Sequence, residues 1–251
     1  MSFKIFHVDA LEKLGGVTAV YTTKERCVWK FGEEGAKENY EVLADALKVS
    51  PSDFTRIYQS HTDRIKVVTK DHKGEMVTRE QVSEECDGMS TDEAGIMLCT
   101  MEADCVPVYI YDPVKNAIGM VHSGWRGTAK EIAVNAIKLM GEKYGSDPGD
   151  IVVALGPHIC GKCYEVGSEL KDEFEENFSK EETDLFFINP HGDKFDLDLG
   201  KAIEISLIKA GVKKENFFDS CPCTKESDNL CSWRRDNPIR QSMLTGLMIN
   251  K

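Results

Sequence analysis

Residues 105–122, CVPVYIYDPVKNAIGMVH, decide how the middle of the chain folds. Two apolar runs that are rich in β-branched and aromatic residues, 106–111 and 117–122, flank the four residues DPVK. A proline in second place is typical of a turn, and loops of this length commonly join antiparallel strands. The stretch therefore predicts a β-hairpin with a four-residue loop.

The register of this hairpin brings two reactive side chains together. If Tyr111 faces Asn116, Cys105 stands directly across from His122. The Cβ atoms of such a facing pair lie roughly 4.5–5.5 Å apart. We therefore predict that a thiol and an imidazole are neighbours.

The segment SGWRG (123–127) follows the hairpin, and a helix is predicted at 128–144. Thr128 and Glu131 would form a Thr-x-x-Glu capping box at the start of this helix. Glycines such as Gly124 let the backbone approach a ligand closely, and a helix N-terminus offers unpaired N–H groups to an anion. Arg126 adds a fixed positive charge beside them. We expect this segment to bind phosphate or another oxyanion.

Further apolar runs with β-branched content predict strands at 65–69, 96–101, 151–155, 185–188 and 216–219. Apolar residues at helical spacing predict helices at 38–47, 168–178 and 199–210. Several strands follow one another without a helix between them, so antiparallel pairing must contribute to a mixed α/β fold. The sequence has no internal repeat or linker, and we expect one domain over residues 1–251.

Composition excludes several classes of partner. The 31 basic and 43 acidic residues give a net charge of −12, and no basic stripe of the kind that binds nucleic acid is visible. No run approaches the ~20 apolar residues of a membrane span, and the first residues do not resemble a secretory signal. We expect a cytoplasmic protein whose nine cysteines are reduced.

A third metal-binding side chain comes from elsewhere in the sequence. Of the six histidines, His61 is best placed, because it ends a short predicted strand beside small polar residues such as Ser60. Two imidazoles and one thiolate are suitable zinc ligands, and three protein ligands leave a fourth position for water or substrate. His61, Cys105 and His122 therefore predict a catalytic zinc site.

Other interpretations of these residues stay open. Cys105 and His122 would also serve as the nucleophile and base of a metal-free hydrolase or deamidase. Asp104 either caps a turn or orients a ligand histidine. A second metal site with four thiolates is a further alternative, and its ligands would be Cys160, Cys163, Cys221 and Cys223.

Several motifs together resemble the YfiH-like, or laccase-domain, family over roughly residues 18–250. They are His61 in its QSH setting, DGMST (87–91), ADCVP (103–107), HSGWRG (122–127), GPHI (156–159), YEVG (164–167), CT (223–224) and SWRR (232–235). Thr62 follows His61 where this family usually has glycine.

The resemblance implies a layered α/β/β/α sandwich and a zinc site that falls on His61, Cys105 and His122. It also implies phosphorolysis of adenosine, inosine or methylthioadenosine and deamination of adenosine, so that purine nucleosides and phosphate are the expected partners. Cys105, His122 and Asp104 would be catalytic, and Arg126, Ser60 and Gly124 would contact substrate or phosphate. An older label for the family is polyphenol oxidase, but six histidines are too few for the coppers of a multicopper enzyme, so copper is expected only as an adventitious occupant.

Overall fold

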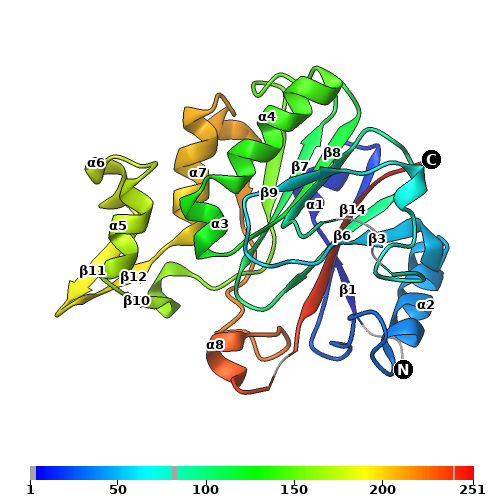
Figure 1. Cartoon of the computed structure of the whole chain (residues 1–251), viewed down its shortest axis with the longest axis horizontal. Coiled ribbons are helices and arrows are strands. Elements are labelled where there is room, and N and C mark those ends of the chain that lie inside the picture. The colour runs from blue at the N-terminus through cyan, green and yellow to red at the C-terminus, as the bar shows by residue number, and fades with distance from the viewer. Residues whose placement is uncertain (1–3, 81–83, 240) are drawn as a thin grey trace.

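Two β-sheets packed face to face form the centre of the protein (Figure 1). The computed structural model describes residues 4–80, 84–239 and 241–251. Five strands form the first sheet, in the order β1 (Ile5–His7), β2 (Val17–Thr22), β14 (Met243–Ile249), β6 (Met97–Glu102) and β3 (Phe54–Arg56). Six strands form the second sheet, in the order β13 (Phe217–Asp219), β9 (Val152–Leu155), β7 (Val106–Asp112), β8 (Ala117–Ser123), β5 (Gly88–Thr91) and β4 (Ile65–Val67).

Helices cover the outer faces of both sheets. The longest helix on the first sheet is α2 (Ala36–Leu47), and the second sheet is covered by α3 (Trp125–Ala129), α4 (Ile132–Tyr144) and α7 (Leu199–Lys209). Shorter elements are α1 (Asp9–Glu12), α5 (Glu169–Glu175), α6 (Lys180–Thr183), α8 (Trp233–Asp236) and the 3₁₀ turns η1 (Pro51–Asp53), η2 (Lys70–His72), η3 (Gly161–Cys163) and η4 (Lys214–Asn216). A small antiparallel sheet contains three strands in the order β10 (Glu165–Gly167), β12 (Lys194–Leu197) and β11 (Phe187–His191). No helix in the described ranges combines the length and apolar character that crossing a bilayer requires.

The alternation of side chains along each strand creates three apolar layers. On β7, Val108 and Ile110 face α4 and α7, whereas Tyr109 and Tyr111 face the first sheet. The layer between the sheets joins residues such as Leu98 of β6 to residues of β7 and β8. This arrangement confirms the predicted layered α/β/β/α sandwich with mixed sheets.

The predicted β7–β8 hairpin is present, but its predicted register is wrong by two residues. Asp112 pairs with Ala117, and His122 pairs with Pro107 instead of Cys105. The reason is that Asp112 ends the strand and its carboxylate accepts hydrogen bonds from the backbone N–H groups of the next turn. Because two residues is an even step, Cys105 stays on the same face as His122, one diagonal position away.

The predicted helix 128–144 is divided in two, and its capping box is wrong. Glu131 has a left-handed backbone (φ 54°) that separates α3 from α4. Thr128 lies inside α3, where its hydroxyl donates to the carbonyl of Gly124 at 3.0 Å. Helix α3 is therefore a single short turn, and the polar groups of residues 123–128 bond to one another.

Most of the other predicted elements are confirmed with shifted ends. The predicted strand 185–188 is largely wrong, because the strand begins only at Phe187 and Phe186 packs among the phenylalanines beneath α5. Strand β14 was not predicted, although it lies in the middle of the first sheet between β2 and β6.

The layer between the two sheets should dominate stability. Met120 is fully buried there, whereas Val114 in the hairpin turn is 64% exposed. Replacing Met120 by alanine should lower the free energy of unfolding by about 2–5 kcal/mol, because it removes buried methylenes and leaves a cavity. Urea denaturation measures this, with Val114→Ala as a control that should change stability by less than about 0.5 kcal/mol. Equal losses in the two variants would contradict this assignment of the core.

Candidate metal centre

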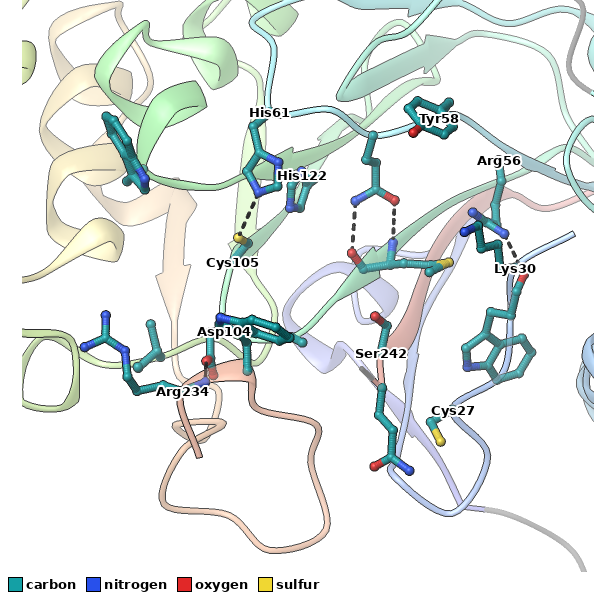
Figure 2. A pocket seen from close by; sticks show the side chains of 18 of the residues that line it. Cys27, Lys30, Arg56, Tyr58, His61, Asp104, Cys105, His122, Arg234 and Ser242 are labelled. Carbon is teal, nitrogen blue, oxygen red and sulfur yellow. Dashed lines mark hydrogen bonds between the residues drawn. The ribbon is translucent and has the colours of Figure 1, made fainter. Parts of the chain in front are cut away.

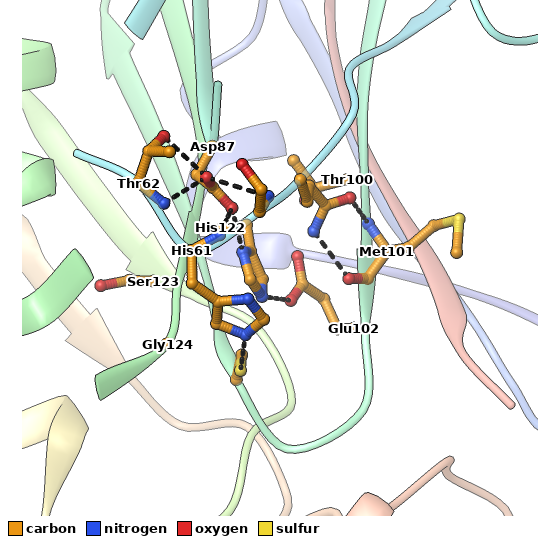
Figure 3. A network of polar contacts seen from close by, with 12 residues as sticks. His61, Thr62, Asp87, Thr100, Met101, Glu102, His122, Ser123 and Gly124 are labelled. Atoms are coloured by element: carbon orange, nitrogen blue, oxygen red, sulfur yellow. Dashed lines mark hydrogen bonds and ion pairs between the residues drawn. The ribbon is translucent and has the colours of Figure 1, made fainter. Parts of the chain in front are cut away.

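A single buried carboxylate, that of Asp87, organises the site (Figure 3). Its Oδ1 accepts a hydrogen bond from the backbone N–H of His61 at 3.0 Å and lies 2.8 Å from Nδ1 of His122. Its Oδ2 accepts from the N–H groups of Ser60 and Thr62 at 3.2 and 2.6 Å, and from the Thr62 hydroxyl at 2.8 Å. One side chain thus fixes both the loop that carries His61 and the ring of His122.

These contacts keep Asp87 charged and set the orientation of both histidines. Burial alone would raise the pKa of Asp87, but the hydrogen bonds from His122 and Thr62 lower it to about 2. His61 has a left-handed backbone (φ 61°), which the three N–H contacts of its loop to the carboxylate hold in place. Since Nδ1 of His122 faces Asp87, its Nε2 is the atom available to a metal.

The three side chains predicted to bind zinc do lie together. The Sγ atom of Cys105 and ring nitrogens of His61 and His122 are all within 4.8 Å of one another. Sγ of Cys105 is 3.9 Å from Nε2 of His61, and the two imidazoles meet edge to face with ring centroids 4.9 Å apart. Two imidazoles and one thiolate converging on one point form a donor set that suits zinc.

Charge inside the cluster favours a thiolate. Burial alone would raise the pKa of the Cys105 thiol, but the imidazoles of His122 and His61 lower it to about 6. Burial alone would likewise lower the pKa of His122, but the carboxylate of Glu102 and the thiol of Cys105 raise it. The cluster therefore presents a negatively charged sulfur at neutral pH, the form of cysteine that binds metals.

Gly124 makes room for two of the ligand side chains. A Cβ atom built at this position would lie 2.8 Å from Cδ2 of His61 and 3.0 Å from Sγ of Cys105. The sequence predicted that Gly124 would let the backbone approach a substrate. The structure instead places the side chains of His61 and Cys105 against it.

Glu102 was not predicted as part of the site. It ends β6 in the first sheet, and its carboxylate lies 3.8 Å from Nε2 of His122 in the second sheet. Burial raises the pKa of Glu102 to about 8, although the neighbouring imidazole of His122 acts in the opposite direction. Asp87 is the first residue of the DGMST motif, but no local sequence signal assigned it or Glu102 to the site, because both approach His122 from other segments of the chain.

Asp104 does not orient a histidine, contrary to one of the predictions. Its Oδ1 accepts from the Thr224 hydroxyl at 2.5 Å and its Oδ2 from the backbone N–H of Arg234 at 2.6 Å. The orienting carboxylate is Asp87. Asp104 instead ties the strand that carries Cys105 to the C-terminal segment.

The side chains of His61, Cys105 and His122 line a cavity of about 760 Å³ (Figure 2). This volume is within the usual range of small-molecule sites. Aromatic side chains line much of it: Trp29, Tyr58, Trp125, Tyr164 and Trp233. Basic side chains line it as well, although the whole protein is acidic: Lys30, Arg56, Arg126 and Arg234.

Two of the basic residues that line the cavity each lie over an aromatic ring. The guanidinium of Arg126 lies 4.2 Å from the ring centre of Trp125, and that of Arg234 lies 4.9 Å from the ring centre of Tyr164. Arg126 was predicted to contact substrate or phosphate, whereas Arg234 was not among the predicted site residues. Within the described chain Ser60 does not line the cavity, and its backbone N–H serves Asp87 instead.

Replacing Asp87 by asparagine should weaken metal binding at this site roughly 10- to 100-fold, the usual effect of losing a carboxylate that orients a ligand histidine. Asparagine keeps the shape of the side chain but removes the charge that His122 and the His61 loop share. Competition with a coloured chelator measures the affinity. The exposed residue Asp150 offers the matched control Asp150→Asn, and an equal loss in that variant would contradict the assignment.

The chain is similar in sequence to several proteins that are named purine nucleoside phosphorylase. It is 32% identical over 201 residues to the purine nucleoside phosphorylase YlmD of Bacillus subtilis, covering 79% of this chain and 72% of that protein. It is 28% identical to the purine nucleoside phosphorylase LACC1 of Mus musculus over 88% of this chain, which spans about half (48%) of the mouse protein.

Solved structures have the same architecture. The hypothetical protein YfiH of Bacillus licheniformis superposes with a TM-score of 0.87 at 30% identity, covering 96% of this chain and 95% of that one. YlmD of Geobacillus stearothermophilus gives 0.86 at 29% identity, covering 95% and 93%. A family model described as multi-copper polyphenol oxidoreductase laccase matches residues 14–250. The chain therefore belongs to this laccase-like, YfiH-type family.

Proposed function

We propose that this protein is a zinc-dependent enzyme that phosphorolyses purine nucleosides such as adenosine, inosine and methylthioadenosine, and that it also deaminates adenosine. The observation that carries the proposal is the convergence of His61, Cys105 and His122 beside a cavity with both basic and aromatic walls. The names of the relatives YlmD and LACC1 support the nucleoside and phosphate as substrates.

Zinc is the metal that best fits the donor set. His61, Cys105 and His122 would hold it, and three protein ligands leave a position for substrate or water. Zinc would supply Lewis acidity and activate water for deamination. Asp87 keeps the Nε2 atom of His122 directed at the cluster through its 2.8 Å contact with Nδ1.

The basic residues give phosphate a place beside the cluster. Helix α3 has only five residues, so its N-terminus contributes little charge, and the proposal rests on the guanidinium groups of Arg126 and Arg234. In phosphorolysis a phosphate oxygen attacks C1′ of the ribose while the C1′–N9 bond breaks. The electron pair of that bond leaves with the purine, which takes up a proton.

The aromatic walls suit the base. Tyr164 and Trp125 flank the cluster, and their flat faces would stack on a purine. Burial raises the pKa of Tyr164 to about 12, so its phenol stays neutral and keeps its proton for hydrogen bonding. Asp104 is assigned a positioning role, because both of its carboxylate oxygens already hold the C-terminal wall of the cavity.

A second candidate function needs no metal. Asp87, His122 and Cys105 also form a chain of acid, imidazole and thiol of the kind that activates cysteine nucleophiles in hydrolases and deamidases. A chelator separates the two functions, because removing the metal abolishes the zinc reaction and spares or exposes the thiol reaction.

Multicopper chemistry has less support, despite the description of the family model. The other four histidines bond elsewhere: His7 to Glu12, His72 to Thr69, His158 to the carbonyl of Gly156, and His191 to Glu165. Two imidazoles at one cluster suit one metal ion and not the several coppers of a laccase. Copper would enter this site only in place of zinc.

Replacing Cys105 by alanine should remove the metal of this cluster and abolish turnover of adenosine with phosphate. The thiolate is the only charged ligand of the three, so the two remaining imidazoles bind zinc weakly. Elemental analysis and release of ribose 1-phosphate measure the two effects. A Cys105→Ala protein with full metal content and full activity would refute the proposal.

Replacing Arg126 by glutamine should raise the KM for phosphate more than the KM for the nucleoside. Losing a hydrogen bond to a charged group costs about 1.5–3 kcal/mol, which corresponds to a roughly 10- to 100-fold change. Lys130→Gln is the matched control, because Lys130 is an exposed cation just after α3 and does not line the cavity within the described residues. A KM for phosphate that rises equally in both variants would argue against a phosphate site at Arg126.

A further inference from the structure

A second group of metal-binding side chains lies apart from His61, Cys105 and His122. The sulfur atoms of Cys160, Cys163 and Cys223 and a carboxylate oxygen of Glu226 are all within 4.8 Å of one another. In a tetrahedral zinc site with Zn–S bonds of about 2.3 Å, the sulfurs lie about 3.8 Å apart. The four side chains thus need only small rotations to share one ion.

The spacing along the chain is that of a zinc knuckle. Cys160 and Cys163 are three residues apart, and η3 between them turns the chain so that both thiols reach the same side. Cys223 and Glu226 have the same three-residue spacing. The four-thiolate site considered from the sequence is therefore wrong in one ligand, because Cys221 lines a separate small cavity beside Tyr21 and Glu226 takes its place in the cluster.

The backbone already holds the two segments together at this point. Cys223 pairs with His158 in an isolated β-bridge, and the N–H of Thr224 donates to the carbonyl of His158 at 2.9 Å. The N–H of Cys160 points at Sγ of Cys223 at 3.4 Å, the hydrogen bond that stabilises a thiolate in metal knuckles. The ligand atoms are thus positioned by secondary structure and not by chance contact of mobile side chains.

A metal ion would bind these side chains in their deprotonated form. Three thiolates and one carboxylate would then carry four negative charges within a few ångströms, and a divalent ion would offset half of them. In the present arrangement the Cys163 thiol instead lies 3.7 Å from a Glu226 oxygen, as its hydrogen-bond donor. Thiolate-rich sites of this kind select zinc among the common divalent ions.

We propose that Cys160, Cys163, Cys223 and Glu226 form a second zinc site with a structural role. Four protein ligands close the coordination sphere, so this ion has no position for substrate. The site is distinct from the proposed catalytic centre and shares no ligand with it.

The second ion would hold one wall of the nucleoside cavity. Ile159 precedes Cys160, and its N–H donates to the carbonyl of Asp104 at 3.0 Å. Thr224 follows Cys223, and its hydroxyl donates to the carboxylate of Asp104. Each of the two segments clamped by zinc therefore touches the residue next to Cys105.

Metal counting tests the site in the 251-residue chain purified under reducing conditions. We expect two zinc ions per chain in the unmodified protein, one in Cys163→Ser and one in Cys105→Ser. Cys221→Ser is the matched control and should keep two. After replacement of zinc by cobalt(II), Cys163→Ser should lose most of the thiolate-to-cobalt absorption, since three of the four thiolates belong to this site, whereas Cys105→Ser should keep most of it.

A subtler variant covers the case in which Cys163→Ser fails to fold. Glu226 is exposed, and Glu226→Gln should weaken the second zinc at least tenfold in chelator competition while leaving the first unchanged. The proposal would be overturned if the unmodified protein and Cys163→Ser each held one zinc ion. It would also be overturned if Glu226→Gln bound the second zinc ion as tightly as the unmodified protein does. A disulfide between two of the three cysteines in the purified protein, detected by mass spectrometry, would overturn it as well. Two zinc ions in Cys105→Ser would instead refute the proposed catalytic site and leave this one standing.

Discussion

The candidate metal centre depends on one buried carboxylate that bonds to a loop and to a strand at once. Asp87 precedes β5, and its oxygens bind the N–H groups of residues 60–62 and the ring of His122 on β8. Its charge is stabilised by hydrogen-bond donors and not by solvent, and burial makes each of these contacts stronger than it would be in water. The left-handed backbone of His61 persists because the same carboxylate holds the residues on either side of it.

The layered fold determines where this carboxylate and its partners can meet. Even-numbered residues of β8 and odd-numbered residues of β7 face the gap between the sheets, where Met120 and Tyr109 are buried. The same alternation, continued to the ends of these strands, turns His122 and Cys105 into the gap, where Glu102 reaches them from the other sheet. The centre is thus the polar end of an otherwise apolar layer, open to solvent through the cavity.

The structural features that follow from local sequence pattern could be predicted from the sequence. The features that depend on contacts between distant segments could not. The hairpin, the face shared by Cys105 and His122, and α2, α4 and α7 follow from periodicity, although Asp112 shifted the register and Glu131 divided the helix. Asp87 and Glu102 were missed because the residues they serve are remote in the chain: 35 positions separate Asp87 from His122. Strand β14 was missed for a related reason, since its partners β2 and β6 lie more than a hundred residues away.

Asp104 connects these observations, because it lies between the two clusters of candidate metal ligands. On one side it precedes Cys105; on the other its carboxylate holds Thr224 and the backbone of Arg234. Its own backbone is left-handed (φ 85°), which directs the side chain away from the histidines and toward the C-terminal segment. Asp104, which its position beside Cys105 suggested as catalytic, thus joins the segment that carries Cys105 to the backbone of Arg234. The proposed phosphate site and the candidate metal centre therefore depend on the same short stretch of backbone between β6 and β7.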